Sequence, residues 1–248
     1  MDIAGKRVVV TGAGANIGEA IAVQFAQAGA RVVVHVGSNT DGGARVVQQI
    51  RSIGGEALAI QADLTESRSV ERLFEEVVAA FGSIDILINN AGAARPTPFS
   101  DSSIEQWQDV FNINFFSAVL CSQRAAARTK PSGGAIVNTS SIRGIGHTGR
   151  EGLMAYSAAK AAMISFTKTL AKELAPSITV NAVAPGFVLT SAYDSMPAEA
   201  KQTFLDATLI KRWITPEELA PAYIYLASQP GVTGQVLTVD GGFTLKTG

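Results

Sequence analysis

The chain has 248 residues, which suits one α/β domain whose core is large enough to need no disulfide. Its 20 basic and 21 acidic residues give a net charge of −1, which offers no positive field for nucleic acid or an anionic membrane. The first residues do not resemble a signal peptide, and no run of roughly 18 apolar residues suggests a membrane span. The only cysteine, Cys121, fits a packed thiol in a reducing compartment. We therefore expect a cytoplasmic globular protein without nucleic-acid or membrane partners.

Short β-branched runs alternate with longer helical stretches along the chain. The runs are apolar on both faces, as strands are when helices cover both sides of a parallel sheet. The predicted strands are Val8–Val10, Val32–Val34, Ala57–Gln61, Ile84–Ile88, Ala135–Asn138, Thr179–Val183 and Gln235–Val239. The predicted helices are Ile17–Gln27, Ala44–Ile53, Ser69–Phe81, the stretch from Ile104 to Thr129, Ala155–Leu174 and Pro216–Ala227. This alternation predicts a single α/β domain on one doubly wound, seven-stranded parallel sheet.

The first strand runs directly into a glycine-rich turn, Thr11–Gly18, and a helix follows. Glycines at a strand-to-helix turn let the backbone approach a pyrophosphate, and the helix N-terminus supplies N–H donors. The turn therefore favours phosphate binding over an ordinary loop.

Two further segments follow strands at the carboxyl edge of the sheet, where ligands bind in such folds. Asp63-Leu64 comes after the third strand, and Asp63 can accept a hydrogen bond from an adenine amino group or cap a helix. Asn89–Gly92 comes after the fourth strand and supplies small and amide residues.

Tyr156 and Lys160 are four residues apart in a predicted helix, and Ser141 lies a short loop upstream. Residues i and i+4 share one helix face, so the phenol and the ammonium project into one place. A cation beside a phenol favours the phenolate, which would make a usable acid/base of an ordinary tyrosine. The alternative is a pair of exposed helix residues.

Together these motifs resemble those of the short-chain dehydrogenase/reductase family over almost the whole chain. The resemblance is carried by Thr11–Gly18, Asp63, Asn89–Gly92, Asn114, Ser140-Ser141, Tyr156, Lys160 and Asn181–Gly186. It implies a Rossmann-type fold and an NAD(P)-dependent oxidoreductase that transfers a hydride between the cofactor and a secondary alcohol or ketone. A catalytically silent dinucleotide-binding sensor or scaffold on the same fold is the alternative.

The resemblance implies four catalytic residues, Asn114, Ser141, Tyr156 and Lys160. Tyr156 would exchange the proton with the substrate oxygen, while Lys160 would lower the pKa of the phenol and hold the nicotinamide ribose. Ser141, the second serine of its pair, would hydrogen-bond the developing alkoxide. Asn114, on a long helix, would hold a water that connects Lys160 to solvent.

The resemblance also implies the contacts of the cofactor and requires no metal. Asn16 stands where the family usually has glycine, and asparagine tolerates the left-handed backbone such a position needs. The cofactor-binding residues implied are Gly12, Asn16, Ile17, Gly18, Ser38, Asn39, Asp63, Leu64, Asn90, Ala91, Gly92, Tyr156, Lys160, Pro185, Gly186, Val188 and Thr190.

The end of the second strand predicts a preference for NADP(H), with NAD(H) possible. A fold selective for NAD usually has an acid about 20 residues past the glycine turn, but Val36 stands there and no acid precedes Asp41. Ser38 and Asn39 can donate hydrogen bonds to a 2′-phosphate, and Gly37 leaves room for it. Asp41 begins the next helix and would reverse the preference if it reached the ribose.

The segment 188–213 is expected to be a substrate-binding lid, because a long excursion inside a compact domain is often functional. A peripheral helical excursion is the alternative. Ile142, Arg143, His147 and Phe187 are expected around the substrate. Arg143 can pair with a carboxylate or phosphate of a ligand, or be an exposed loop residue or a subunit contact.

The resemblance further implies a homotetramer. The helical stretches Phe111–Arg128 and Ala155–Leu174 would supply contacts between subunits, and the tail Val239–Phe243 would pack at another interface.

Overall fold

Seven parallel strands form one sheet in the computed structural model, which describes residues 1–129 and 133–246. The strands are β1 (Arg7–Val10), β2 (Arg31–Val36), β3 (Glu56–Gln61), β4 (Ile86–Asn89), β5 (Gly134–Thr139), β6 (Ile178–Pro185) and β7 (Val236–Val239). Their order is β3-β2-β1-β4-β5-β6-β7, so the direction of winding reverses between β1 and β4. This order confirms the predicted Rossmann-type sheet, and the predicted strand ends differ by only one or two residues.

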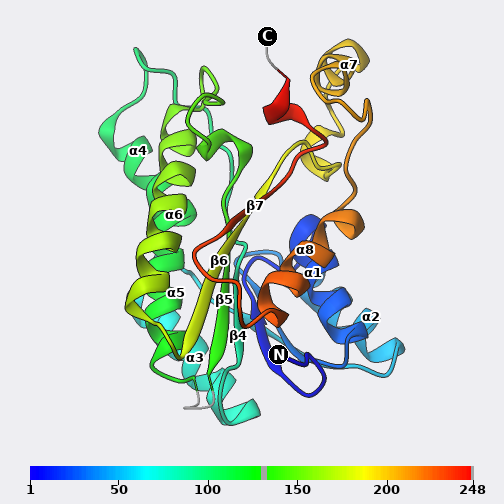
Figure 1. Cartoon of the computed structure of the whole chain (residues 1–248), viewed down its shortest axis with the longest axis vertical. Coiled ribbons are helices and arrows are strands. Elements are labelled where there is room, and N and C mark those ends of the chain that lie inside the picture. The colour runs from blue at the N-terminus through cyan, green and yellow to red at the C-terminus, as the bar shows by residue number, and fades with distance from the viewer. Residues whose placement is uncertain (130–132, 247–248) are drawn as a thin grey trace.

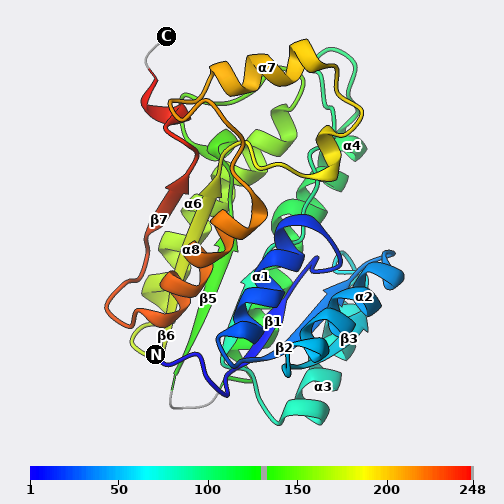
Figure 2. The ribbon, with the colours of Figure 1, turned by 90° about the vertical axis from the view of Figure 1, so that its right-hand side faces the viewer.

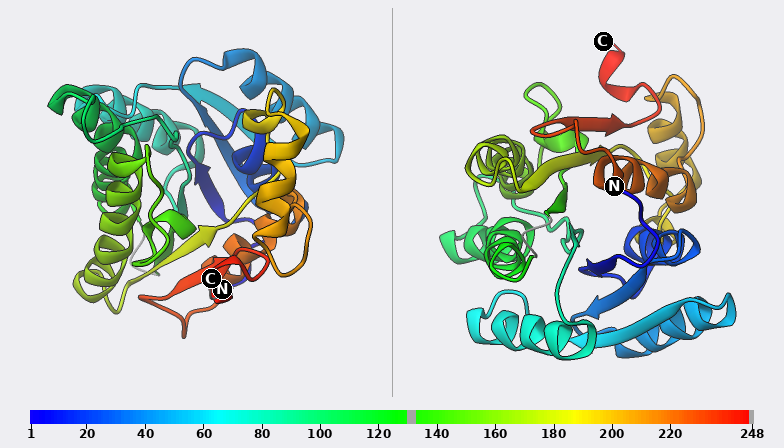
Figure 3. Two further views of the ribbon diagram at one scale, coloured as in Figure 1. Left: turned by 90° about the horizontal axis from the view of Figure 1, so that it is seen from above. Right: turned by 60° about the horizontal axis from the view of Figure 1, so that its bottom comes forward.

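Helices cover both faces of the sheet. The helices of the chain are α1 (Asn16–Gln27), α2 (Thr40–Ser52), α3 (Ser67–Phe81), α4 (Ile104–Phe111), α5 (Ser117–Ala126), α6 (Met154–Glu173), α7 (Ala198–Asp206) and α8 (Pro216–Ser228). Figure 1 shows α1, α2 and α8 on one side and α3, α5 and α6 on the other, and the views in Figure 3 keep the sheet between these layers. Among the residues described, no helix has the length and apolarity to cross a membrane.

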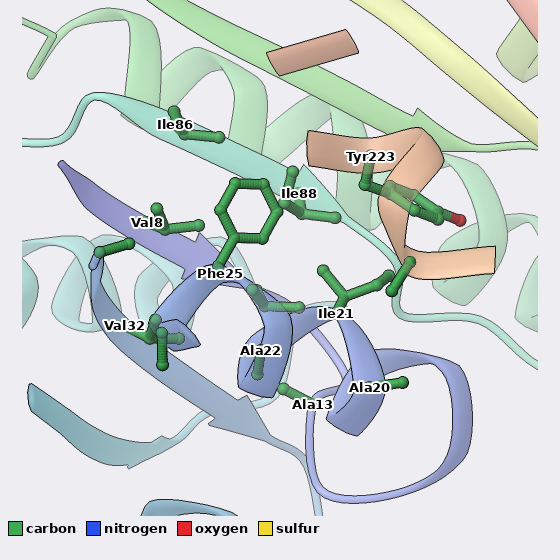
Figure 4. Packing of buried hydrophobic residues seen from close by; sticks show 14 of the residues in the cluster. Val8, Ala13, Ala20, Ile21, Ala22, Phe25, Val32, Ile86, Ile88 and Tyr223 are labelled. Atoms are coloured by element: carbon green, nitrogen blue, oxygen red, sulfur yellow. The ribbon is translucent and has the colours of Figure 1, made fainter. Parts of the chain in front are cut away.

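The inner strands are buried on both faces, because successive side chains point to opposite sides of the sheet and helices cover both sides, whereas the edge strands β3 and β7 are partly exposed. Val8 and Val10 belong to the core beneath α1 and α8, whereas Val9 belongs to the core on the other face. Phe25 of α1 and Tyr223 of α8 are fully buried in the first core. Figure 4 shows Phe25 against Val8 on the sheet. These two cores hold the carboxyl edges of β1, β4 and β5 in fixed register.

The stretch predicted to be helical from Ile104 to Thr129 is helical as far as Ala126. A π-helical turn, Asn112–Phe116, joins α4 to α5 within it. The Asn114 amide donates to the Val110 carbonyl, and the Ser117 hydroxyl donates to the Ile113 carbonyl. Side-chain bonds of this kind compete with the helical ladder, and π-turns often mark functional sites.

The helix predicted from Ala44 begins earlier, at Thr40. Asn39 caps it by accepting a hydrogen bond from the Gly42 backbone N–H at 3.1 Å. Asp41 therefore lies in the first turn of α2, as predicted. The predicted helix start missed this turn because Gly42 and Gly43 are poor helix formers.

The segment 188–213 leaves the sheet after β6 and contains a short 3₁₀ turn, Ser191–Tyr193, and α7. A β-bridge between Val188 and Ile214 closes its base. Figure 2 shows α7 above the carboxyl end of β7, next to the C-terminal turn Phe243–Leu245. The segment thus lies at the edge of the sheet where the predicted site residues gather.

Candidate active site

Two adjoining cavities open at the carboxyl edge of the sheet, with volumes of about 560 and 760 Å³. Both are lined by Gly12, Gly37, Asn39, Asn90 and Gly92, so they form one cleft. Every residue predicted to bind the cofactor lines one cavity or the other. The cleft lies where the winding of the sheet reverses, which is the ligand-binding position of this fold class.

The glycine-rich turn has the backbone that the sequence predicts. Gly12 has φ of +64° and Asn16 has φ of +52°, so asparagine does adopt the left-handed conformation. A Cβ on Gly14 would lie 2.9 Å from Val36 Cγ1, and a Cβ on Gly18 would collide with the Gly12 carbonyl oxygen. These positions need glycine because the turn packs tightly against its neighbours.

His35 holds the turn from the end of β2. Its Nδ1 accepts from the Gly12 backbone N–H at 3.1 Å, and its Nε2 donates to the Ala62 carbonyl at 3.1 Å. His35 is buried, and burial lowers its pKa, with the Ala62 hydrogen bond acting in the opposite direction. This role could not be predicted, because no local sequence pattern pairs a strand-end histidine with a glycine some twenty residues before it.

Asn90 braces the turn from β4. Its side-chain amide donates to the carbonyl oxygens of Thr11 and Gly12 at 3.0 and 3.2 Å. The Thr11 hydroxyl in turn accepts from the backbone N–H groups of Asn90 and Ala91. The small residues after β4 are thereby fixed against the glycine-rich turn.

The second cavity extends along Asp63, Leu64 and Ser38. Asp63 accepts from the Thr65 hydroxyl and backbone N–H, and these hydrogen bonds lower its pKa. The alternative that Asp63 caps a helix is wrong, because α3 begins at Ser67 with Glu66 before it. Its side chain instead closes a short Asx-type turn at the cavity wall.

At the end of β2 the Asn39 side chain is already engaged. It accepts from Gly42 and donates to the Gly14 carbonyl at 3.2 Å, so it braces α2 against the glycine-rich turn. Ser38 is exposed beside it. Arg45, which the sequence analysis missed, reaches the Gly14 carbonyl at 3.4 Å while paired with Glu19.

Tyr156 and Lys160 project from α6 into the first cavity. The Lys160 Nζ lies 5.7 Å from the centre of the Tyr156 ring and donates to the Thr139 carbonyl at 2.8 Å. Lys160 is buried, and burial lowers its pKa to about 8. The shared helix face predicted from their spacing is therefore present.

The pKa of Tyr156 differs from the expectation. Burial raises it, while the nearby Ser141 side chain and the Arg143 cation lower it. The Lys160 ammonium donates to the Thr139 carbonyl, and no hydrogen bond joins it to the phenol among the described residues. The phenol is thus held in its protonated form at neutral pH.

The two adjacent serines have different surroundings. The Ser140 hydroxyl is buried and donates to the Lys160 carbonyl at 2.8 Å, which ties the loop to α6. The Ser141 hydroxyl accepts from the Arg143 backbone N–H at 3.1 Å and lies close enough to Tyr156 to lower its pKa. The geometry therefore favours Ser141 as the serine that meets a substrate.

Asn114 lies behind this site and does not line either cavity. Its carboxamide bonds to the Ala93 backbone N–H and carbonyl and to the Val110 carbonyl. A Cβ on Gly92 would lie 2.6 Å from Asn114 Oδ1 and 3.3 Å from Lys160 Nζ. The Asn114 side chain therefore fixes the backbone after β4 beside Lys160. A water between Asn114 and Lys160, as expected from the sequence, would have to bond to the remaining lone pair of the Asn114 Oδ1.

The remaining predicted residues complete the first cavity. Pro185, Gly186, Val188 and Thr190 line it after β6. Asn16 reaches across to the segment 188–213: its Nδ2 donates to the Ser191 hydroxyl and its Oδ1 accepts from the Ser191 backbone N–H, both at 3.1 Å. The side chain that replaces glycine thus joins the two walls of the cleft.

The cleft fits a dinucleotide. The helix α1 begins without a side-chain cap, so its first N–H groups face the turn without a side-chain acceptor. The glycine positions leave no room for side chains between that helix end and the turn. Within residues 1–129 and 133–246, no group of three or more His, Cys, Asp or Glu is placed to hold a metal ion.

Comparisons with known proteins agree with this geometry. The family model described as "Enoyl-(Acyl carrier protein) reductase" matches residues 12–244. A 3-oxoacyl-[acyl-carrier-protein] reductase of Synechocystis sp. is 39% identical over 242 residues, which cover 96% of each chain.

Two solved structures are also similar over almost their whole length. A short-chain type dehydrogenase/reductase from Mycobacterium marinum is 33% identical, with a TM-score of 0.93 over 99% of this chain and 98% of its own. A 7α-hydroxysteroid dehydrogenase complexed with NADH and 7-oxo glycochenodeoxycholic acid is 36% identical, with a TM-score of 0.91 over 97% of this chain and 94% of its own. The chain belongs to the short-chain dehydrogenase/reductase family of oxidoreductases.

Proposed function

We propose that the protein is an NAD(P)-dependent oxidoreductase that interconverts a secondary alcohol and a ketone. The observation that carries this proposal is the shared cavity: Tyr156, Lys160 and Ser141 line the same cavity as the glycine-rich turn. A group bound on the turn and a carbonyl beside the phenol would therefore lie next to each other. Bound nicotinamide supplies or accepts the hydride.

The chain's own residues handle the proton and the charge. Tyr156 donates its proton to the carbonyl oxygen during reduction and takes it back during oxidation. Burial raises the pKa of the phenol and keeps it protonated near neutral pH, while the Ser141 side chain and the Arg143 cation lower that pKa and make the phenol a better proton donor. Ser141 donates a hydrogen bond to the oxygen on which negative charge develops.

Lys160 and Asn114 support these groups. The buried ammonium of Lys160 is fixed by the Thr139 carbonyl and would bind the ribose hydroxyls next to the nicotinamide. With a pKa near 8, Lys160 can also return a proton to the phenol after each turnover. Asn114 holds the chain at Ala93 in place beside it.

The rival function is a dinucleotide sensor that binds the cofactor without turnover. A sensor needs no proton relay, so a buried lysine four residues from a phenol in the cavity favours the enzyme. The test is the absorbance of reduced nicotinamide in the presence of a panel of ketones. The panel should start with 3-oxoacyl thioesters, named for the Synechocystis relative, and include steroids and small oxo acids. If the protein binds the reduced cofactor but no ketone in the panel oxidises that cofactor, the sensor function would be supported.

We further propose that NADP(H) is preferred over NAD(H). The end of β2 carries Val36 and exposed Gly37 and Ser38, with no carboxylate to repel a 2′-phosphate. Arg45 adds a guanidinium near the Gly14 carbonyl, although Glu19 offsets its charge. Comparison of kcat/KM for the two cofactors tests this. A ratio that favours NAD(H) by more than about tenfold would mean that Asp41, or another acid, reaches the 2′-hydroxyl of the ribose.

The segment 188–213 is proposed as the substrate lid. Its support is an aromatic cluster in which Tyr193, Phe204 and Trp213 of the segment pack with Phe187, the rings of Phe187 and Phe204 lying 4.6 Å apart. Tyr193 also lines the cavity that holds Tyr156. The cytoplasmic location and the homotetramer remain predictions.

A further inference from the structure

Two arginines lie on the loop between Ser141 and α6, and both stack on the aromatic cluster beside the active site. The Arg143 Cζ lies 5.5 Å from the centre of the Phe187 ring and 5.3 Å from that of Phe243. The Arg150 Cζ lies 5.3 Å from the centre of the Phe204 ring. Because the Phe187 and Phe204 rings touch, the two guanidinium groups lie on neighbouring parts of one surface.

Neither guanidinium pairs with a carboxylate in the part of the chain that the structure describes. The only hydrogen-bond acceptor that Arg143 has there is the Thr148 carbonyl, at 3.0 Å from its Nη1. By contrast, Arg31 and Arg212 each bind a glutamate. The two guanidinium groups beside the active site thus have no carboxylate counter-ion among the described residues.

The two cations also act on each other. Burial and the nearby Arg150 charge both lower the pKa of Arg143. Arg143 is half-buried against two rings, where water screens charge less than at the open surface. Two like charges held close together without a counter-ion destabilise the empty site, and an anion between them would remove that cost.

Tyr193 connects this pair to the reacting atoms. Its phenol lies near enough to Arg143 and Arg150 for both cations to lower its pKa, while burial raises it. The same side chain lines the cavity with Ser141 and Tyr156, and its charge state affects the pKa of Tyr156. Tyr193 therefore connects the cavity to the two guanidinium groups, which lie on the aromatic cluster that packs against its ring and do not themselves line the cavity.

We propose that Arg143, Arg150 and Tyr193 form a subsite for an anionic group of the substrate. The proposal rests on the proposed carbonyl chemistry and narrows its substrates to hydroxy and oxo compounds that bear a carboxylate or a phosphate. Guanidinium groups bind both anions through paired N–H donors, and the aromatic rings beneath them would contact the carbon skeleton. Exposed Arg150 would meet the anion first, and half-buried Arg143 would hold it against the aromatic cluster beside the cavity.

The test compares matched substrates. Oxo acids of increasing chain length are measured against their methyl esters, which keep the carbonyl but lose the charge, and a phosphate ester of a hydroxyketone distinguishes phosphate from carboxylate. The wild-type protein should have a higher kcat/KM for the charged member of each pair by about tenfold to a hundredfold. The favoured chain length then reports the separation between carbonyl and anion.

Variants assign the effect to the two arginines. Arg150→Gln, at an exposed position where folding is least affected, should reduce the acid-to-ester ratio of kcat/KM by about tenfold, and Arg143→Gln should reduce it further. Arg72→Gln, which removes an exposed charge from α3, is the matched control and should leave the ratio unchanged. Thermal unfolding of Arg143→Gln shows whether that variant folds, and Arg150→Gln keeps the test valid if it does not.

The outcomes separate the two proposals. Equal turnover of acid and ester by the wild-type protein, or an unchanged ratio in Arg150→Gln, overturns the anion subsite and leaves the carbonyl reductase in place. Absence of turnover with every ketone removes the proposed function and the subsite together.

Discussion

At the scale of single residues, His35 shows how a buried side chain can set the conditions for binding. The Gly12 N–H is a donor, so the Nδ1 that faces it carries no proton, and Nε2 carries the proton given to Ala62. A second proton, on Nδ1, would place the N–H of the His35 ring against the backbone N–H of Gly12. The glycine-rich turn therefore requires neutral His35.

This requirement predicts a loss of stability in acid. The folded-state pKa of His35 is lowered, so the unfolded chain binds a proton below about pH 6.5 that the folded chain resists. Stability from this group is complete above that pH and falls as the pH decreases, by at most about 1.4 kcal/mol per pH unit. Urea unfolding between about pH 7.5 and 5 measures it.

His35→Asn should flatten this pH dependence. The control is the same change at the chain's other histidine, His147, which is exposed and should leave the profile unaltered. If both variants keep the wild-type slope, His35 does not carry the proton that destabilises the fold.

Replacing each serine of the pair by alanine should affect a different property, turnover for Ser141 and stability for Ser140. Ser141→Ala should reduce turnover and leave the fold stable, because its hydroxyl lies at the phenol. Ser140→Ala should instead lower stability by about 1 kcal/mol, because it removes a buried hydrogen bond to α6. Steady-state kinetics and thermal unfolding of both variants decide between them, and a larger loss of turnover in Ser140→Ala would show that the serines are assigned in the wrong order.

At the scale of elements, the regular strands and most helices could be predicted because their apolar patterns are long and consistent. The π-helical turn at Asn112–Phe116 could not, since it depends on side-chain bonds of Asn114 and Ser117 that leave no periodic signal. The early start of α2 depends in the same way on one cap, Asn39. Predictions failed where one side chain overrides the backbone preference of its neighbours.

The link between the glycine-rich turn and the segment 188–213 predicts coupling between two distant positions. Asn16→Gly keeps the left-handed backbone but removes both hydrogen bonds to Ser191, so the cleft should open and the reduced cofactor should dissociate faster. Ser191→Ala should have a smaller effect in the same direction. Stopped-flow nicotinamide fluorescence measures both rates.

The double variant is the control for this coupling. If Asn16 acts through Ser191, the change in the logarithm of the cofactor dissociation rate in the double variant will be smaller than the sum of the changes in the two single variants. If the logarithmic changes of the two single variants simply add in the double variant, that result would contradict a direct link between Asn16 and Ser191 across the cleft.

At the scale of the whole molecule, the cofactor end of the site was largely predictable and the substrate end was not. Gly12, Gly18, Asn90 and Pro185 lie in short motifs at the ends of strands or just after them, so topology alone brings them together. Tyr193, by contrast, enters the cavity from a segment without regular pattern. Its position depends on aromatic packing between segments that are far apart in the sequence.

The aromatic surface around the π-helical turn predicts assembly of several chains. Phe116 is 49% exposed although it packs against Phe111 and Phe115, which leaves an apolar face next to α6 unburied. We expect a homotetramer, with Phe116→Glu shifting it to smaller species. Light scattering measures the mass of the wild-type protein and of the variant. A single-chain mass for the wild-type protein at micromolar concentration would contradict the prediction.

The proposed role of Tyr156 is tested most directly by measuring both the turnover and the cofactor affinity of the variant Tyr156→Phe. The change removes one hydroxyl at the cavity wall and leaves the glycine-rich turn and Lys160 untouched. On the best ketone found, kcat should fall by roughly 10²–10⁴-fold, while the dissociation constant for reduced cofactor, from fluorescence titration, stays near the wild-type value. Wild-type kcat in this variant would contradict the central claim that the phenol of Tyr156 transfers the proton.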